Sequence, residues 1–165
     1  MQSRGYSLVE VVVVTGIVSV LLAIATLKFK EFAESSRIEA QTRLIYSELL
    51  KARINALYQR RTTRVKLYPD RFEVYSSTRD DSDGAAAVQT RALQYPITCN
   101  GNGDAENGYA LDFDAKGLAR NACSICLAEE RGLGGVDSVI IAPVRLSVGK
   151  KEQGDACKAE HITIR

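Results

Sequence analysis

The sequence predicts an α+β fold, in which one long N-terminal helix packs on a small, mainly antiparallel β-rich head. Two observations lead to this prediction. No proline occurs before Pro69 and the only glycine between Tyr6 and Tyr58 is Gly16, so one helix can run without a break through this stretch. Short runs of alternating apolar and polar residues then follow, separated by turn-forming residues. Strands that all follow one long helix are typical of an α+β domain.

The first half of the predicted helix is apolar from Tyr6 to Leu27, with Glu10 as its one acid. These 22 residues span about 33 Å as a helix, which is enough to cross a bilayer. A secretory signal has an apolar core of only about 7–15 residues. The run is closed by charged residues from Lys28 onward rather than by a small-residue cleavage site. We therefore expect a membrane helix that remains in the mature protein, with any cleavage before it.

Glu10 is unusual inside such a run. An unpaired carboxylate at the middle of a membrane helix costs about 2.5–3.5 kcal/mol, although the helix dipole offsets part of this near an N-terminus. One interpretation is that the acid reaches the lipid headgroups. The other is that it pairs with a cation: if the chain is cut after Gly5, the free amine of Tyr6 in a neighbouring subunit is such a partner.

The run Gly5-Tyr6-Ser7-Leu8-Val9-Glu10 resembles the type IV prepilin cleavage motif, in which an aromatic residue follows the glycine and a glutamate follows an aliphatic residue. The usual aromatic residue is Phe, from which Tyr6 is a mild departure. The resemblance implies that prepilin peptidase cuts between Gly5 and Tyr6 and that the new terminus of Tyr6 is N-methylated. It also implies an assembly role for Glu10 beside other pilins or pseudopilins and an inner-membrane assembly platform.

The same resemblance divides the chain into four parts: a leader peptide (1–5), a transmembrane helix (6–27), an amphipathic helical stem (28–58) and a β-rich head (59–165). It places the protein in the bacterial inner membrane with one membrane pass and the head in the periplasm. From there the subunit is expected to enter a pilus or a pseudopilus.

The stem carries one apolar stripe. Its members are spaced by alternating steps of four and three residues, which is the period of one helix face: Ile38, Thr42, Ile45, Leu49, Ala52 and Ala56. Tyr46, Leu50 and Leu57 widen the stripe. We expect this face to pack against the head and the helix to end near Tyr58.

Strands are predicted throughout the head. Residues 64–68 and 71–75 alternate on either side of a Pro-Asp turn and predict a hairpin. Residues 76–87 are expected to form an acidic surface loop, and residues 100–107 a second loop. Further strand candidates lie at 91–95, 109–113, 124–127, 138–141, 145–148 and 161–164.

This order of elements, with the segment from Phe113 to Gly117, resembles the GspH/FimT group of minor pseudopilins and minor pilins. The resemblance implies a structural subunit of a type II secretion pseudopilus or a type IV pilus. The alternative is a pilus-tip binding module, such as a DNA receptor in natural transformation. Some minor pilins bind DNA through a C-terminal Gly-Arg-x-Arg motif, whereas this chain has Gly149-Lys150-Lys151, which puts that role in doubt.

Charge is distributed unevenly along the chain. Residues 28–68 carry ten Lys or Arg against four Asp or Glu, whereas residues 69–114 carry three against nine. Such segments suit packing against unlike neighbours in an assembly, and they are also ordinary on solvated surfaces. Basic residues near the end of the helix are candidates for a phosphate-binding groove: Arg53, Arg60, Arg61, Arg64 and Lys66.

All four cysteines lie in the head: Cys99, Cys123, Cys126 and Cys157. If the head is extracytoplasmic, disulfides are permitted, and four cysteines allow three pairings. Cys123 and Cys126 would face opposite sides of a strand, so we expect bonds between distant segments. Free thiols and a zinc site are the alternatives, although the spacing does not match common zinc fingers. Haem attachment in its usual form is excluded, because Leu127 follows Cys126 where His is required.

The sequence predicts no enzyme, no cofactor and no metal site. His161 is the only histidine, and we expect it at the surface or on an edge strand. No nucleophile motif of the Gly-x-Ser-x-Gly type occurs. Asp80, Asp81 and Asp83 lack the residues that complete a helix–loop–helix calcium site, so a solvated loop is the preferred interpretation.

Overall fold

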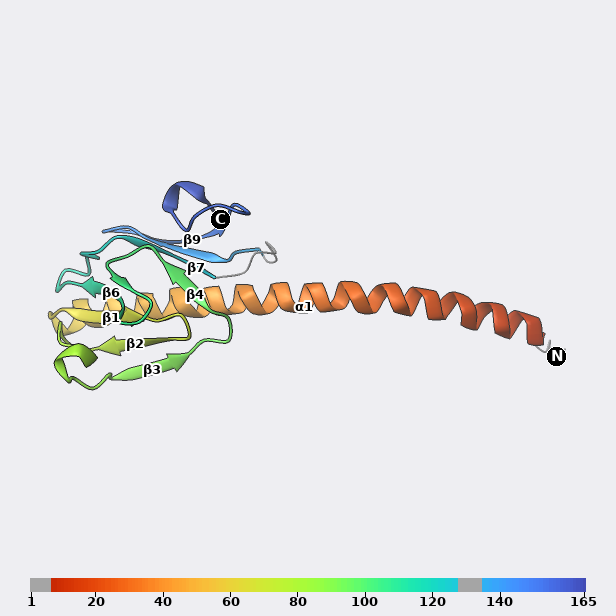
Figure 1. The fold of residues 1–165 in the computed structure, drawn as a ribbon, viewed down its shortest axis with the longest axis horizontal. Coiled ribbons are helices and arrows are strands. Elements are labelled where there is room, and N and C mark those ends of the chain that lie inside the picture. The colour runs from red at the N-terminus through yellow and green to blue at the C-terminus, as the bar shows by residue number, and fades with distance from the viewer. Residues whose placement is uncertain (1–6, 128–134) are drawn as a thin grey trace.

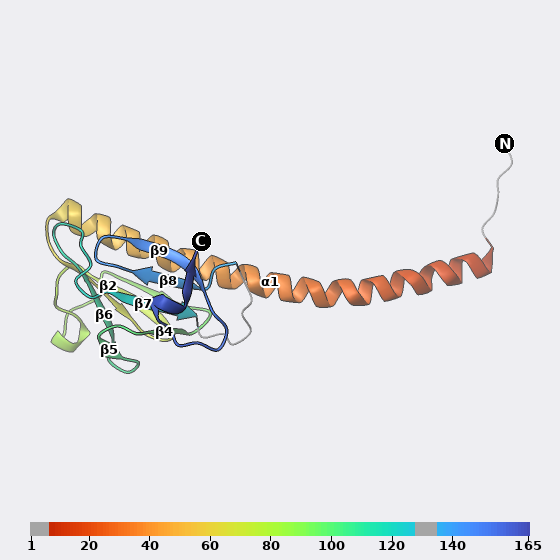
Figure 2. The same cartoon turned by 90° about the horizontal axis from the view of Figure 1, so that it is seen from above.

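A single long helix organises the molecule. The computed structural model describes residues 7–127 and 135–165. Helix α1 (Leu8–Gln59) has 52 residues, or about 78 Å at the standard rise. It ends at Arg60, whose left-handed backbone (φ 52°) lets its N–H cap the carbonyls of Ala56 and Leu57. The N-terminal half of α1 projects from the head as a gently curved rod (Figures 1 and 2). The prediction of one unbroken helix is therefore confirmed over the described residues.

The predicted stripe of α1 is its buried face. All six residues of the stripe are at most 2% exposed. The widening residues Tyr46 and Leu50 are partly buried and pack against the core. Leu57 is 44% exposed, and it lies over Gly117, where a Cβ atom would come within 2.8 Å of the leucine side chain. The C-terminal half of α1 is thus held by the head.

The head contains two antiparallel five-stranded sheets. The first has the order β3-β2-β1-β6-β5 and the second the order β10-β9-β8-β7-β4. The strands of the first sheet are β1 (Thr63–Leu67), β2 (Arg71–Tyr75), β3 (Gln89–Ala92), β5 (Gly103–Asp104) and β6 (Gly108–Phe113). Those of the second are β4 (Ile97–Cys99), β7 (Cys123–Leu127), β8 (Ser138–Ile141), β9 (Leu146–Lys151) and β10 (Ile162–Ile164). Two 3-10 turns, η1 (Asp81–Asp83) and η2 (Ala159–His161), complete the described elements.

Most predicted strands are found, with shifts at their ends. The hairpin of β1 and β2 is present, with Leu67 opposite Phe72. The strand expected at 91–95 instead occupies Gln89–Ala92, and β9 extends to Lys151. Strands β4 and β5 were not predicted, and β5 lies within the expected loop 100–107. Strands of three and two residues are too short to show an alternating pattern, so partners in the sheets define them.

One core joins the helix to both sheets. Buried side chains of α1 share a cluster with Val65 and Leu67 of the first sheet and Ile125 and Val139 of the second. All five residues of β7 are buried, because neighbouring strands flank it and both of its faces are covered. The C-terminal segment after β9 folds back over the head (Figure 1). The head is therefore a closed unit around the C-terminal half of α1.

Candidate functional site

The N-terminal half of α1 exposes apolar surface along its length. Every large hydrophobic side chain that the structure describes between Leu8 and Phe32 is at least 46% exposed. An 18-residue window in this helix has a mean hydropathy of 2.7 and none of it is buried, so α1 is long and apolar enough to cross a membrane. A continuous apolar surface of this size is unfavourable in water and marks a region that a membrane or other proteins cover.

Glu10 lies in the first turn of α1 and is exposed. The N-cap residue, Ser7, makes no side-chain capping bond, and an acid in the first turn is favoured by the unpaired amides and the dipole of the helix. Within residues 7–127 and 135–165, no cation pairs with Glu10. Gly5 and Tyr6 lie outside the described residues, so cleavage between them and methylation of Tyr6 stay predictions.

Two of the predicted nucleic-acid contacts are used inside the head. Arg64 donates to Asp112 over 2.7 and 2.9 Å and to Asp80 over 2.8 Å. The side chain of Lys66 is only 4% exposed. Its ammonium pairs with Asp81 and lies 3.4 Å from Asp80. The structure argues against a phosphate-binding role for Arg64 and Lys66, because carboxylates of the same head already neutralise both charges.

The expectation of a wholly solvated acidic loop at 76–87 is wrong for Asp80. This residue is 5% exposed, and its carboxylate accepts a hydrogen bond from the Ser82 backbone. Burial alone would raise the pKa of Asp80, but the Arg64 guanidinium and the Ser82 amide outweigh it and bring the pKa down to about 2. Next to it, Tyr68 donates to Asp81 over 2.8 Å. The loop thus folds onto strand β1 through η1.

Three of the predicted basic residues lie nearer the surface. Arg60 and Arg61 are exposed at the end of α1, and Arg53 is partly exposed about two turns before them. The Arg61 side chain donates to Gln59 over 2.7 Å. Of the five basic residues predicted to line a phosphate-binding groove, these three arginines therefore remain candidates.

The structure pairs two of the four cysteines. Cys126 and Cys157 form a disulfide with a Cα–Cα distance of 5.8 Å. It fastens the C-terminal loop between β9 and η2 to the outer side of β7. Cys99 and Cys123 are free and buried, and both belong to the core cluster. Cys123 and Cys126 face opposite sides of β7, which agrees with the predicted strand geometry.

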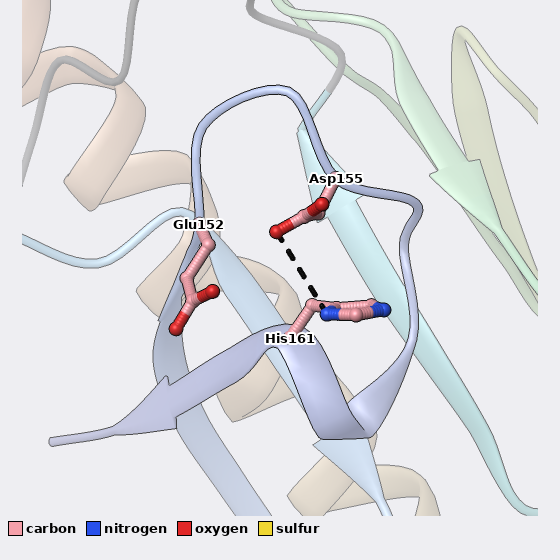
Figure 3. Close-up of side chains that lie close together, drawn as sticks. All are labelled: Glu152, Asp155 and His161. Atoms are coloured by element: carbon pink, nitrogen blue, oxygen red, sulfur yellow. Dashed lines mark ion pairs between the residues drawn. The ribbon is translucent and has the colours of Figure 1, made fainter.

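A group of three side chains in the C-terminal segment was not anticipated. The ligand atoms of Glu152, Asp155 and His161 lie within 4.8 Å of one another. His161 Nδ1 is 3.8 Å from an Asp155 oxygen, and the dashed line in Figure 3 marks this pair. The two acids are exposed and His161 is partly exposed. No residue spacing signals this group, because a folded loop brings its members together. Three surface side chains of this kind do not by themselves define a metal site.

Comparisons with known proteins agree with the helix and the head. The family described as the prokaryotic N-terminal methylation motif matches residues 1–26. A crystal structure of the type IV minor pilin FimU of Pseudomonas aeruginosa is similar with a TM-score of 0.52 and 17% identity, covering 71% of this chain and 91% of that one. A second crystal form of FimU gives a TM-score of 0.47 at 16% identity, with 67% and 90% covered. No curated protein matches the chain.

A long helix with an exposed apolar half, packed through its other half on antiparallel sheets, is the pilin fold. With the methylation motif at its N-terminus, the chain is a type IV pilin-like protein. Its N-terminal helix and its motif are consistent with a membrane-anchored pilin.

Proposed function

We propose that this chain is a minor pilin or minor pseudopilin, a structural subunit of a type IV pilus or of a type II secretion pseudopilus. The observation that carries the proposal is the apolar half of α1, which is exposed along its whole length and holds one acid, Glu10. In a membrane this half is an anchor, and in a filament it packs among equivalent helices. The likeness in fold to a minor pilin supports the same assignment.

In this proposal the subunit is processed and stored before assembly. Prepilin peptidase removes residues 1–5, Tyr6 is methylated, and the helix spans the inner membrane with the head in the periplasm. The Cys126–Cys157 disulfide supports this placement of the head, since disulfides persist in oxidising compartments. An inner-membrane platform then passes the subunit to neighbouring pilins, where Glu10 pairs with the amine of an adjacent Tyr6.

The test of assembly is Glu10→Ala in the full-length chain, expressed together with its neighbouring pilins. Removing one partner of a buried ion pair costs about 3–5 kcal/mol, so crosslinking to neighbours should fall by roughly a hundredfold or more. Membrane insertion should stay intact. The matched control is Glu31→Ala on the same helix, whose acid is exposed and, among the residues that the structure describes, pairs with Lys28. Equal crosslinking of parent and Glu10→Ala would refute the pairing.

Processing is tested separately, by mass spectrometry of the protein purified from membranes. The mature chain should begin at a methylated Tyr6. An intact Met1 terminus, or a cut near Ala25 as in a secretory signal, would contradict the pilin assignment.

The second candidate function, a DNA-binding pilus tip, is supported by the exposed Arg60 and Arg61 and the partly exposed Arg53. A groove that tracks the DNA backbone needs several unpaired cations, and Arg64 and Lys66 are paired within the head. A salt-dependent mobility shift of the head with DNA, abolished by Arg60→Ala and Arg61→Ala together, would favour this candidate over a purely structural subunit.

A further inference from the structure

Cys99 and Cys123 meet where the chain passes between the two sheets. Cys99 ends β4 in the second sheet. The chain then forms β5 and β6 in the first sheet and returns to the second at Cys123, the first residue of β7. The two cysteines therefore flank the segment that forms β5 and β6. A bond between them would join the two ends of this segment.

Two hydrogen bonds beside the cysteines hold the ends of this segment together. The Asn100 amide donates to the Ser124 carbonyl over 3.2 Å. The Ser124 amide donates in return to the Asn100 side chain over 2.6 Å. Each of these two residues is next to one of the cysteines in the chain, so the pair fixes Cys99 and Cys123 as neighbours on the core face of the sheet.

Gly101 leaves the space in which the two sulfurs meet. A Cβ atom at Gly101 would lie 3.3 Å from Cys99 Sγ and 3.6 Å from Cys123 Sγ. Both sulfurs thus border the same small volume, and the absence of a side chain at Gly101 keeps it open. Both cysteines are at most 9% exposed. A hydrogen bond from the Cys123 thiol lowers the pKa of Cys99, and the same contact, together with burial, raises the pKa of Cys123.

We propose that Cys99 and Cys123 form a second disulfide, on the opposite face of β7 from the Cys126–Cys157 bond. The inference rests on the proposed function, because it needs the head to be outside the cytoplasm. The bond would tie β4, which is the edge strand among the described strands and pairs with β7, to the rest of the sheet. It would also join the two ends of the segment that carries β5 and β6.

The oxidant is an exchangeable disulfide of the periplasmic thiol-oxidase class. The Cys99 thiolate attacks one sulfur of the oxidant, forms a mixed disulfide and releases the first oxidant thiolate. The Cys123 thiol then loses its proton and attacks the Cys99 sulfur, which expels the second oxidant thiolate. Two electrons and two protons pass from the cysteines to the oxidant. Because both sulfurs are buried in the folded head, the exchange takes place before the core closes.

The test is alkylation of the full-length protein, extracted from membranes, unfolded without reductant and mapped by tandem mass spectrometry. We expect no alkylated cysteine in the parent. Trypsin leaves Cys123 and Cys126 on one peptide, because residues 121–130, between Arg120 and Arg131, contain neither Lys nor Arg. Single substitutions therefore identify the partners: Cys99→Ser should make Cys123 alkylatable, and Cys157→Ser should make Cys126 alkylatable.

Each other outcome has a separate meaning. Alkylation of Cys99 and Cys123 in the parent, with the Cys126–Cys157 bond present, would overturn the second disulfide and leave the proposed placement of the head standing. Four alkylatable thiols would overturn both. If Cys99→Ser freed Cys126 or Cys157 instead of Cys123, the proposed pairing would be wrong. The measurement on the parent needs no variant, so a substitution that prevents folding does not remove the test.

Discussion

Replacing Arg64 by Met should destabilise the head rather than weaken binding to nucleic acid. The Arg64 side chain is 20% exposed, and its partners Asp80 and Asp112 are 7% and 12% exposed. Methionine has a similar length but no charge, so the substitution removes the Arg64 cation from the nearly buried Asp112 carboxylate and leaves Asp80 with the Lys66 ammonium at 3.4 Å. Breaking a buried ion pair on one side costs about 3–5 kcal/mol of unfolding free energy.

The pH dependence of this cost follows from the pKa of Asp80. That pKa is about 2 in the folded head, against a usual value of 3.8. A carboxylate with a lowered pKa adds stability above its unfolded pKa, and this stability is lost as the pH falls through the folded value. The shift corresponds to about 2 kcal/mol. The difference between parent and Arg64→Met should therefore be full above pH 5 and shrink toward pH 2 by at most this amount, because Ser82 and Lys66 also lower the pKa of Asp80 and remain in the variant.

The assay is urea unfolding of the head, followed by circular dichroism at several pH values. The control is Arg61→Met, since the Arg61 side chain is exposed and bonds only to Gln59 among the described residues. Surface substitutions of this kind usually change stability by less than about 0.5 kcal/mol. A loss below about 1 kcal/mol for Arg64→Met, or a loss that does not change with pH, would refute the argument that this ion pair is buried and structural.

Three further predictions concern the head. Residues 37–165 should fold alone as a soluble domain, because the core residues that α1 contributes in the described structure begin at Ile38. Loss of the near-ultraviolet circular dichroism signal of this fragment would contradict the prediction. Replacing Cys126 and Cys157 by Ala together should lower the unfolding free energy by about 3.7 kcal/mol in the loop-entropy treatment, given their separation of 31 residues; chemical unfolding of the parent and of this double variant, both without reductant, measures it. Gly117→Ala should lower the unfolding free energy by about 1–2 kcal/mol or more, because the φ of Gly117 is +71° and a Cβ atom there would clash with Leu57 of α1. The control is Gly84→Ala: its φ is +72°, but a Cβ atom there meets no atom within 4 Å, so this variant should show the backbone cost alone.

The sequence was sufficient where neighbouring residues alone decide the structure. The spacing of the stripe from Ile38 to Ala56 predicted which face of α1 is buried, because helix geometry places residues three and four apart on one side. The alternation around Pro69 predicted the first hairpin for the same reason. The run from Gly5 to Glu10 indicated a pilin-like N-terminus, since a motif of this kind is a short local segment, and it lies within the matched methylation motif.

Contacts between distant residues could not be predicted in this way. The basic segment 28–68 and the acidic segment 69–114 suggested packing between subunits or ordinary solvated surfaces, but Arg64 and Lys66 pair with Asp80 and Asp81 within one head. Strand β4 is too short to carry its own signal and exists because β7 offers a partner. The sequence left three cysteine pairings open. Only the fold, which brings Cys157 back across the sheet to Cys126, decided one of these bonds, because the distance between two sulfurs depends on strand order and not on spacing along the chain.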